Sequence, residues 1–202
     1  KKDAQPVQFQ LTLQKMQGEE DWEILGRLVP LKEDYLLQFL QKEQLTFNLG
    51  NELIAVEELS QRLVRNLPRY IDVSDTAMIR IGLREILINA IEHGNLAITF
   101  EEKSQELSSG NYSEFIAMRQ TDPKYRERTV TVDYNLDDAG VVYRIQDQGS
   151  GFDHAILGKK LTVSESEELP LHGRGIMITR NAFDLVEYNE KGNEVRLLKY
   201  FR

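Results

Sequence analysis

The sequence predicts an α+β domain, built as a two-layer sandwich of a mixed, mostly antiparallel sheet covered by helices on one face. Two regions, 129–145 and 185–201, each read as a pair of strands joined by a turn. Three segments, 52–67, 76–93 and 175–183, have the apolar spacing of helices. A length of 202 residues suits one large domain or one domain with an appended segment, and a content of 41% hydrophobic and 29% charged residues is ordinary for a globular protein.

The composition excludes several classes of function. A net charge of -8 argues against direct binding to nucleic acid, which needs a basic face. The chain has no cysteine, so disulfides and thiolate metal sites are excluded. No apolar run reaches the length of a membrane span and no signal-peptide pattern is present, so we expect a cytoplasmic protein without membrane contact. Because the sequence begins with Lys1, we expect a processed chain or a piece of a longer protein.

Residues 1–44 form an amino-terminal extension to which the sequence assigns no chemistry. Residues 5–13 alternate apolar and polar side chains after a proline, which predicts a strand. Residues 22–28 and 31–40 read as two helical pieces separated by Pro30. The extension is an additional layer, a dimer contact or the end of a linker.

The main domain spans residues 45–202 and begins with a predicted strand over 45–49. The first helix of this domain ends at Pro68, because proline disfavours helical geometry in the residue before it. A long helix then begins near Thr76 and ends at Gly94-Asn95, two residue types that tolerate the left-handed conformation.

Residues 99–128 are polar and too long for a simple turn, so we expect an insertion that packs partly on the surface, with a short helix over 112–118. The strands then resume at Thr129. A loop over 153–172, polar at its centre, leads to the last helix and the closing hairpin.

Three polar side chains share one stripe of the long helix, because residues four apart lie on the same face. They are Glu85, Asn89 and His93. Burying an acid, an amide and an imidazole is costly unless the groups are paired or used. Taken alone, the stripe is equally well read as the wet face of an amphipathic helix.

Two glycine-rich motifs follow. Asp147-x-Gly149-x-Gly151 comes after a strand, where glycines permit close approach of a flat ligand and the carboxylate can accept a hydrogen bond from an exocyclic amine of adenine. Gly173-Arg174-Gly175 precedes a helix, whose free N–H groups form an anion site. Alone, each motif is more typical of an ordinary turn or loop-to-helix junction, and Arg174 is at least as typical of a solvated side chain as of a phosphate ligand.

In this order and spacing, the three motifs resemble the ATP-binding domain shared by gyrase, Hsp90, histidine kinases and MutL, the GHKL type with its Bergerat-type fold. The run Glu85-Ile-Leu-Ile-Asn-Ala-Ile-Glu-His-Gly-Asn95 is most similar to the anti-sigma-factor serine/threonine kinases of bacterial partner-switching systems. The resemblance covers roughly residues 45–201, interrupted by the insertion.

The resemblance implies that the cofactors are ATP and Mg²⁺, with Glu85 as the catalytic base and Asn89 as the ligand of Mg²⁺. It implies an ATP lid between His154 and His172. The implied ATP-binding residues are Asn89, His93, Asp147, Gly149, Gly151, Phe152, Gly173, Arg174, Gly175 and Ile176. One departure is that Leu171-His172 stand where some relatives have an arginine ahead of the lid-end glycines, which bears on phosphotransfer more than on nucleotide binding.

The resemblance further implies an ATP-dependent kinase that phosphorylates a STAS-type anti-sigma antagonist and holds a sigma factor inactive, and that the chain can form a homodimer. The alternative is a nucleotide-binding regulatory module that acts by protein contact with little or no phosphotransfer. A complete histidine kinase is disfavoured, because no histidine precedes His93 to serve as the acceptor.

Overall fold

The computed structural model describes residues 9–17, 22–30, 37, 39–152 and 174–201 of the chain. Contacts divide the chain into two compact units, residues 1–40 and residues 41–202. We describe each unit separately.

The first unit contains one antiparallel hairpin of strands β1 (Phe9–Gln17) and β2 (Trp22–Pro30). The predicted strand over 5–13 is confirmed for its described part. The predicted helix over 22–28 is wrong, because the segment is a strand that pairs with β1 along its whole length. Most of the helix predicted over 31–40 lies outside the described residues.

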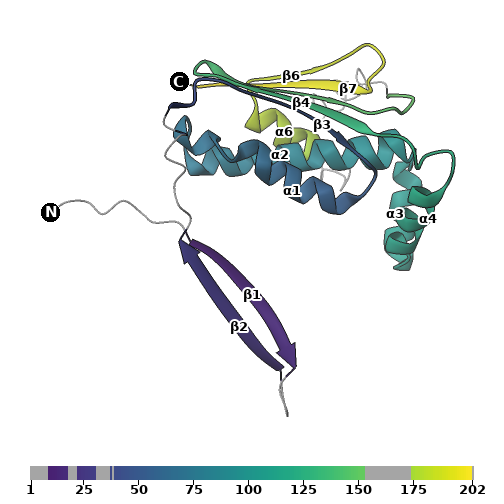
Figure 1. The fold of residues 1–202 in the computed structure, drawn as a ribbon. Coiled ribbons are helices and arrows are strands. Elements are labelled where there is room, and N and C mark those ends of the chain that lie inside the picture. Colours follow the sequence, from purple (N-terminus) through teal and green to yellow (C-terminus); the bar gives the residue numbers. More distant parts are fainter. Residues whose placement is uncertain (1–8, 18–21, 31–36, 38, 153–173, 202) are drawn as a thin grey trace, which may run out of the picture. The chain divides into compact units, whose positions relative to one another are not determined.

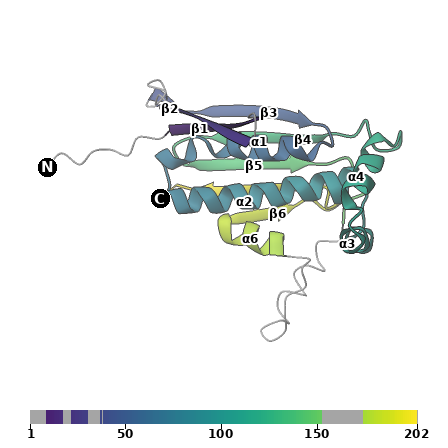
Figure 2. The same cartoon turned by 90° about the horizontal axis from the view of Figure 1, so that it is seen from below.

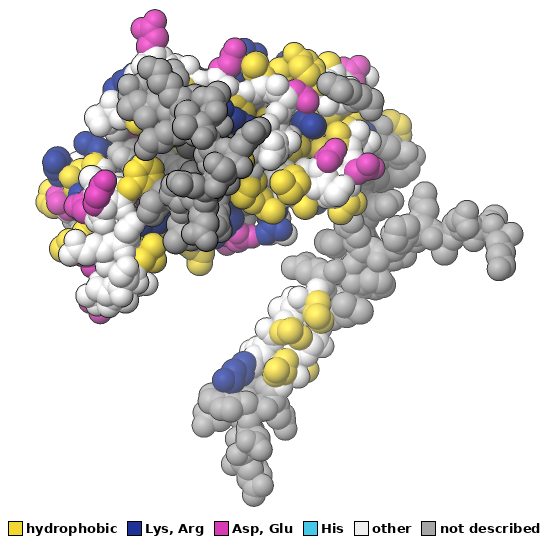
Figure 3. Space-filling model, turned by 180° about the vertical axis from the view of Figure 1, so that it is seen from behind, with side chains coloured by type: hydrophobic (Ala, Val, Ile, Leu, Met, Phe, Trp, Pro, Cys, Tyr) yellow, Lys and Arg dark blue, Asp and Glu magenta, His cyan; other side chains and the backbone are white. Residues whose placement is uncertain are grey.

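The hairpin carries exposed apolar side chains. Figure 3 shows hydrophobic side chains gathered along it, and four of them are more than half exposed: Leu11, Leu13, Ile24 and Leu25. A two-stranded sheet is at best marginally stable alone in water, since it has little apolar area to bury.

The second unit is a five-stranded sheet whose described strand pairs are all antiparallel. Its spatial order is β3 (Glu43–Leu49), β4 (Val130–Leu136), β5 (Gly140–Gln146), β7 (Glu194–Tyr200) and β6 (Leu185–Tyr188). Hairpin connections join β4 to β5 and β6 to β7, as the turn signals predict.

Three helices cover one face of this sheet (Figure 1): α1 (Leu53–Val64), α2 (Val73–Asn89) and α6 (Arg174–Ala182). Seen from the helical side, α2 runs along the sheet between α1 and α6 (Figure 2). It begins one turn earlier than predicted, after Asp72, and a short 3-10 turn, η2 (Leu67–Arg69), connects it to α1. The predicted fold class, two layers with helices on one face, is confirmed.

The core lies between the sheet and these helices. Tyr143 on β5 is fully buried there, and its hydroxyl donates a 3.2 Å hydrogen bond to the carbonyl oxygen of Leu63 on α1. Burial raises the pKa of this phenol well above its ordinary value. The largest fully buried side chains of the described residues include Tyr134, Tyr143, Leu63, Leu67, Ile79, Leu83, Leu87, Ile91, Leu96 and Ile98.

The long helix does not stop at Asn89. It continues into a π-helical turn, η3 (Ala90–Asn95), which leads into the insertion. The insertion consists of α3 (Phe100–Ser109) and α4 (Tyr112–Thr121), and both lie at the end of the sheet where α2 finishes (Figures 1 and 2). Thr99 caps α3 through a reciprocal capping box with Glu102. None of the described helices is both long and apolar enough to cross a membrane.

Candidate functional site

The end of α2 carries two of the predicted site residues on one face. Asn89 is the last residue of α2 and is half-buried. Glu85, one turn earlier, has a side chain that is 32% exposed, with one carboxylate oxygen 3.6 Å from the Arg84 guanidinium. This face of α2 is therefore partly open, which a ligand site requires.

The amino-terminal end of α6 packs directly against Glu85. A Cβ added to Gly175 would lie 2.6 Å from Glu85 Oε2 and 3.1 Å from Glu85 Cβ. Only a glycine lets the backbone approach the carboxylate this closely. Residues 90 positions apart in the sequence thus meet, and the predicted base lies beside the helix N-terminus predicted to bind phosphate.

The Asp147 corner packs against the other end of the site, at η3. A Cβ added to Gly94 would lie 2.3 Å from Asp147 Cγ, and one added to Gly149 would lie 2.4 Å from the Gly94 carbonyl oxygen. The Asp147 carboxylate also accepts a 2.7 Å hydrogen bond from the Gly149 N–H. The glycines therefore permit a close fit between the strand end and the helix end.

Asp147 lies in a half-buried position that disfavours its ionised form. Burial raises the pKa of this carboxyl, and the Gly149 N–H and the charges of Lys191 and Arg128 offset the increase only in part. A half-buried carboxyl with a raised pKa beside the end of α2 is a candidate for ligand recognition as well as for the packing of the corner. This is consistent with a role in accepting a hydrogen bond from a base.

Gly151 and the turn after β6 complete this side of the site. Gly151 has φ of +79°, and a Cβ there would lie 1.8 Å from the Lys191 carbonyl oxygen. Gly192 approaches the Phe152 backbone equally closely. The Phe152 ring is 42% exposed and meets Tyr188 edge-on, with ring centroids 5.2 Å apart.

His93 turns toward the connecting segment. Its Nδ1 lies 2.6 Å from the Ile98 carbonyl oxygen, and since a carbonyl only accepts, Nδ1 carries the hydrogen. The ring also packs on Phe100, with centroids 4.4 Å apart. These contacts assign His93 a structural part in ending the helix.

Part of the predicted site lies outside the described residues. This applies to Gly173 and to the predicted lid with His154 and His172. Arg174 and Ile176 are described as the start of α6 by their backbone only.

The residues present fit a magnesium ion held mainly by its substrate. Within the described ranges, no group of three or more histidine or acidic side chains could hold a metal. Asn89 supplies an amide oxygen that makes no hydrogen bond to another described residue. Magnesium keeps several waters and takes further ligands from phosphates, so one amide oxygen suits it.

Sequence reasoning missed a buried amide network that ties the corner together. Asn95, fully buried, donates a 2.9 Å hydrogen bond to the Asn51 side chain and accepts one of 2.9 Å from the Gln148 N–H. Asn193 donates to the Asp147 carbonyl oxygen at 2.8 Å. The one local signal was Asn95 in the Gly94-Asn95 helix stop, which is equally well explained by its backbone preference.

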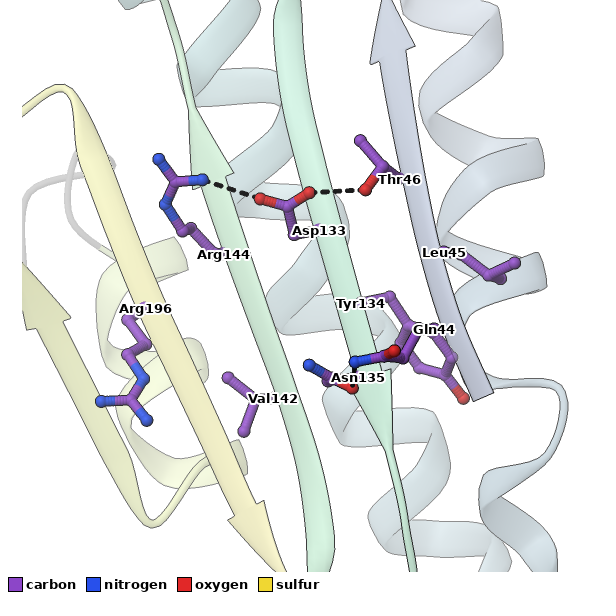
Figure 4. A pocket seen from close by; sticks show the side chains of 9 residues that line it. All are labelled: Gln44, Leu45, Thr46, Asp133, Tyr134, Asn135, Val142, Arg144 and Arg196. Carbon is purple, nitrogen blue, oxygen red and sulfur yellow. Dashed lines mark hydrogen bonds and ion pairs between the residues drawn. The ribbon is translucent and has the colours of Figure 1, made fainter. Parts of the chain in front are cut away.

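A separate pocket of about 500 Å³ lies on the opposite, helix-free face of the sheet (Figure 4). Its polar lining consists of neighbours on adjacent strands. Asp133 accepts a 2.7 Å hydrogen bond from the Thr46 hydroxyl and forms a 2.7 Å ion pair with Arg144. Arg144 also forms a 2.9 Å ion pair with Glu194. The lining side chains thus pair with one another, and the pocket is distinct from the predicted site.

Fold and site together define a two-layer α+β domain with a candidate nucleotide-binding site at the end of its long helix. Residues 116–199 match the family model of the histidine kinase-like ATPase domain. The match supports an ATP-binding, kinase-like function of the GHKL type. It covers the end of α4, strands β4 to β7 and α6, whereas Glu85, Asn89 and His93 precede it. No curated protein matches the chain.

Proposed function

We propose that the protein is an ATP-dependent serine/threonine kinase of a bacterial partner-switching system. The observation that carries this proposal is the contact of Glu85 with Gly175, which puts a carboxylate beside the N-terminus of α6. A helix N-terminus suits the phosphates of a nucleotide, and a carboxylate beside it suits proton transfer. A module that only binds nucleotide has no need of that carboxylate.

The reaction would use the residues in named roles. Asp147 accepts a hydrogen bond from the adenine amine, and the N–H groups at the start of α6 face the phosphates. Asn89 would hold Mg²⁺, which neutralises charge on the phosphates when it is bound. Glu85 accepts the proton of a serine or threonine hydroxyl, the hydroxyl oxygen bonds to the γ-phosphorus, and the bond from that phosphorus to the bridging oxygen breaks to release ADP.

The proposed protein substrate is an anti-sigma antagonist of the STAS type, and the proposed second partner is a sigma factor held inactive. Phosphorylation would add charge at the interface with the antagonist and so favour the other partner. This assignment is supported by the resemblance of the run from Glu85 to Asn95.

Phosphotransfer is the direct test. The full chain would be incubated with Mg²⁺, γ-labelled ATP and a panel of purified STAS-domain antagonists, beside Glu85→Ala and the control Glu58→Ala on the exposed side of α1. We expect label on a serine or threonine of one antagonist, and a loss of about 100-fold or more in rate for Glu85→Ala alone. Equal rates for wild type and Glu85→Ala would contradict the assignment of the base.

A nucleotide-binding module without phosphotransfer is the second candidate. The observation that favours it is the arginine placed between the lid-end glycines, with Leu171-His172 ahead of them. ATP-dependent capture of a partner without any transfer of label to it would support this candidate over the kinase.

A further inference from the structure

Three cations contact η3 or the residue after it: Lys103 from α3, Arg119 from α4, and Arg128 from the segment between α4 and β4. Lys103 Nζ lies 2.5 Å from Glu92 Oε2. Arg128 donates a 2.9 Å hydrogen bond to the Asn95 carbonyl oxygen, and Arg119 donates one of 3.2 Å to the Leu96 carbonyl oxygen. Cations at the C-terminal end of a helix interact favourably with its free carbonyl groups.

Glu92 is the group in this arrangement whose burial costs the most free energy. It is 2% exposed, and within the described residues Lys103, itself a quarter exposed, forms its ion pair. The Tyr112 phenol of α4 lies beside it, and burial together with the Glu92 carboxylate raises the pKa of this phenol. A carboxylate buried this deeply depends on its partner, because removing one member of a buried pair leaves an uncompensated charge.

The backbone that follows η3 is also held in a constrained form. Ala97 has φ of +51°, a left-handed conformation that is uncommon for a residue other than glycine. The carbonyl groups on either side of it, on Leu96 and Ile98, accept the hydrogen bonds of Arg119 and His93. Such a conformation persists only when surrounding contacts fix it.

The same turn forms one wall of the Asp147 corner. Gly94 lies within η3 and packs against both Asp147 and Gly149, and Asn95 accepts from the Gln148 N–H. A shift of η3 by a fraction of an ångström would therefore displace the Asp147 carboxylate, which is predicted to accept a hydrogen bond from the adenine amine. The insertion therefore contacts η3, and η3 in turn contacts the Asp147 corner.

We propose that Lys103 is a positioning residue, which through its ion pair with Glu92 holds η3 in the form that packs against the Asp147 corner. The inserted hairpin then acts as a clamp that sets nucleotide affinity. This inference rests on the proposed nucleotide site and adds a residue that contacts no nucleotide. A loosened clamp would lower affinity by the fraction of molecules in which η3 leaves its binding-competent form.

The test compares Lys103→Met with Lys103→Arg, with Glu92→Gln/Lys103→Met and with the control Lys124→Met on the exposed surface of the same insertion. Amide hydrogen exchange over residues 90–98 is measured without nucleotide, and the affinity for Mg²⁺-ATP is measured by titration calorimetry. For Lys103→Met we expect faster exchange over 90–98, unchanged exchange in α1, and affinity weaker by about tenfold.

The matched variants separate positioning from a general loss of stability. Lys103→Arg keeps the charge and should stay within about threefold of wild type in affinity, as should Lys124→Met. The double variant removes the unpaired buried carboxylate and should recover part of the loss, so it remains informative if Lys103→Met does not fold.

Two results would overturn the proposal: wild-type exchange over 90–98 in Lys103→Met, or faster exchange with unchanged ATP affinity. If the wild-type chain does not bind ATP, the proposed function fails. The exchange data then decide by themselves whether Lys103 holds η3.

Discussion

Gly175 and Glu85 fit together so closely that a single added methyl group would collide with the carboxylate. A Cβ on Gly175 would lie 2.6 Å from Glu85 Oε2 and 3.2 Å from Glu85 Cγ. The two residues come from different helices, α6 and α2, that pack side by side on the sheet. This contact couples the position of the predicted base to the start of α6.

Gly175→Ala should therefore impair phosphotransfer more than folding. Alanine in a helix is favoured over glycine by up to about 1 kcal/mol, which offsets part of the clash, while the Glu85 side chain must turn away. We expect the melting temperature to change little and the rate of label transfer to fall by about tenfold or more. Thermal denaturation and the labelled-ATP assay measure the two effects.

Gly26→Ala is the matched control, because a Cβ there meets only ordinary contacts of 3.5 and 3.9 Å with leucine side chains of β1. It should leave the transfer rate unchanged. A Gly175→Ala protein with the wild-type rate would show that Glu85 need not lie where the structure places it.

Asp147→Asn should stabilise the free protein at neutral pH. Because burial raises the folded-state pKa of Asp147, the stability that this group contributes is fully present below its ordinary pKa of 3.8 and is lost as the pH rises through the folded-state pKa. An amide resembles the protonated acid and avoids this loss, while its oxygen can still accept from the Gly149 N–H.

The measurement is urea denaturation from pH 4 to pH 7. The free energy of unfolding of Asp147→Asn should exceed that of wild type at pH 7, and the difference should shrink toward pH 4. The control Asp138→Asn, in the exposed turn between β4 and β5, should follow wild type throughout. A variant less stable than wild type at pH 7 would show that the carboxylate is needed for folding.

Residues 41–202 should fold without the amino-terminal hairpin. The two units form separate sets of contacts, and every buried core residue described lies at Leu49 or beyond. We expect the melting temperature of a 41–202 chain to stay within about 4 °C of the full chain, the shift that roughly 1 kcal/mol produces in a domain of this size. A drop well beyond that would show that the hairpin supports the sheet.

The sequence predicted the five strands and three covering helices of the main unit because their apolar periods are long and clear. It predicted the wrong structure for β2, where a run of mixed apolar residues fits both periods over a short length. Pairing with β1 makes this segment a strand, and such pairing is a tertiary contact that the local sequence does not show.

The sequence predicted the motifs of the site, but it did not predict the contacts between them. Asp147 and the glycines around it follow from turn chemistry, whereas the packing of Gly94 on Asp147 joins residues 53 positions apart and depends on the register of the sheet. The burial of Glu92 has no local signal either. It arises because the π-helical turn and the insertion enclose a carboxylate that an amphipathic pattern would place in solvent.

Binding of Mg²⁺-ATP to the full chain, measured by titration calorimetry with Asp147→Asn as the comparison, tests the central claim most directly. The structure predicts saturable binding at one site per chain, and an affinity at least about tenfold weaker in the variant, because a charge-assisted hydrogen bond to the base is lost. Absence of saturable binding by wild type up to about 1 mM ATP would contradict the nucleotide site itself. Equal affinity of the two proteins would contradict the assignment of Asp147 to adenine.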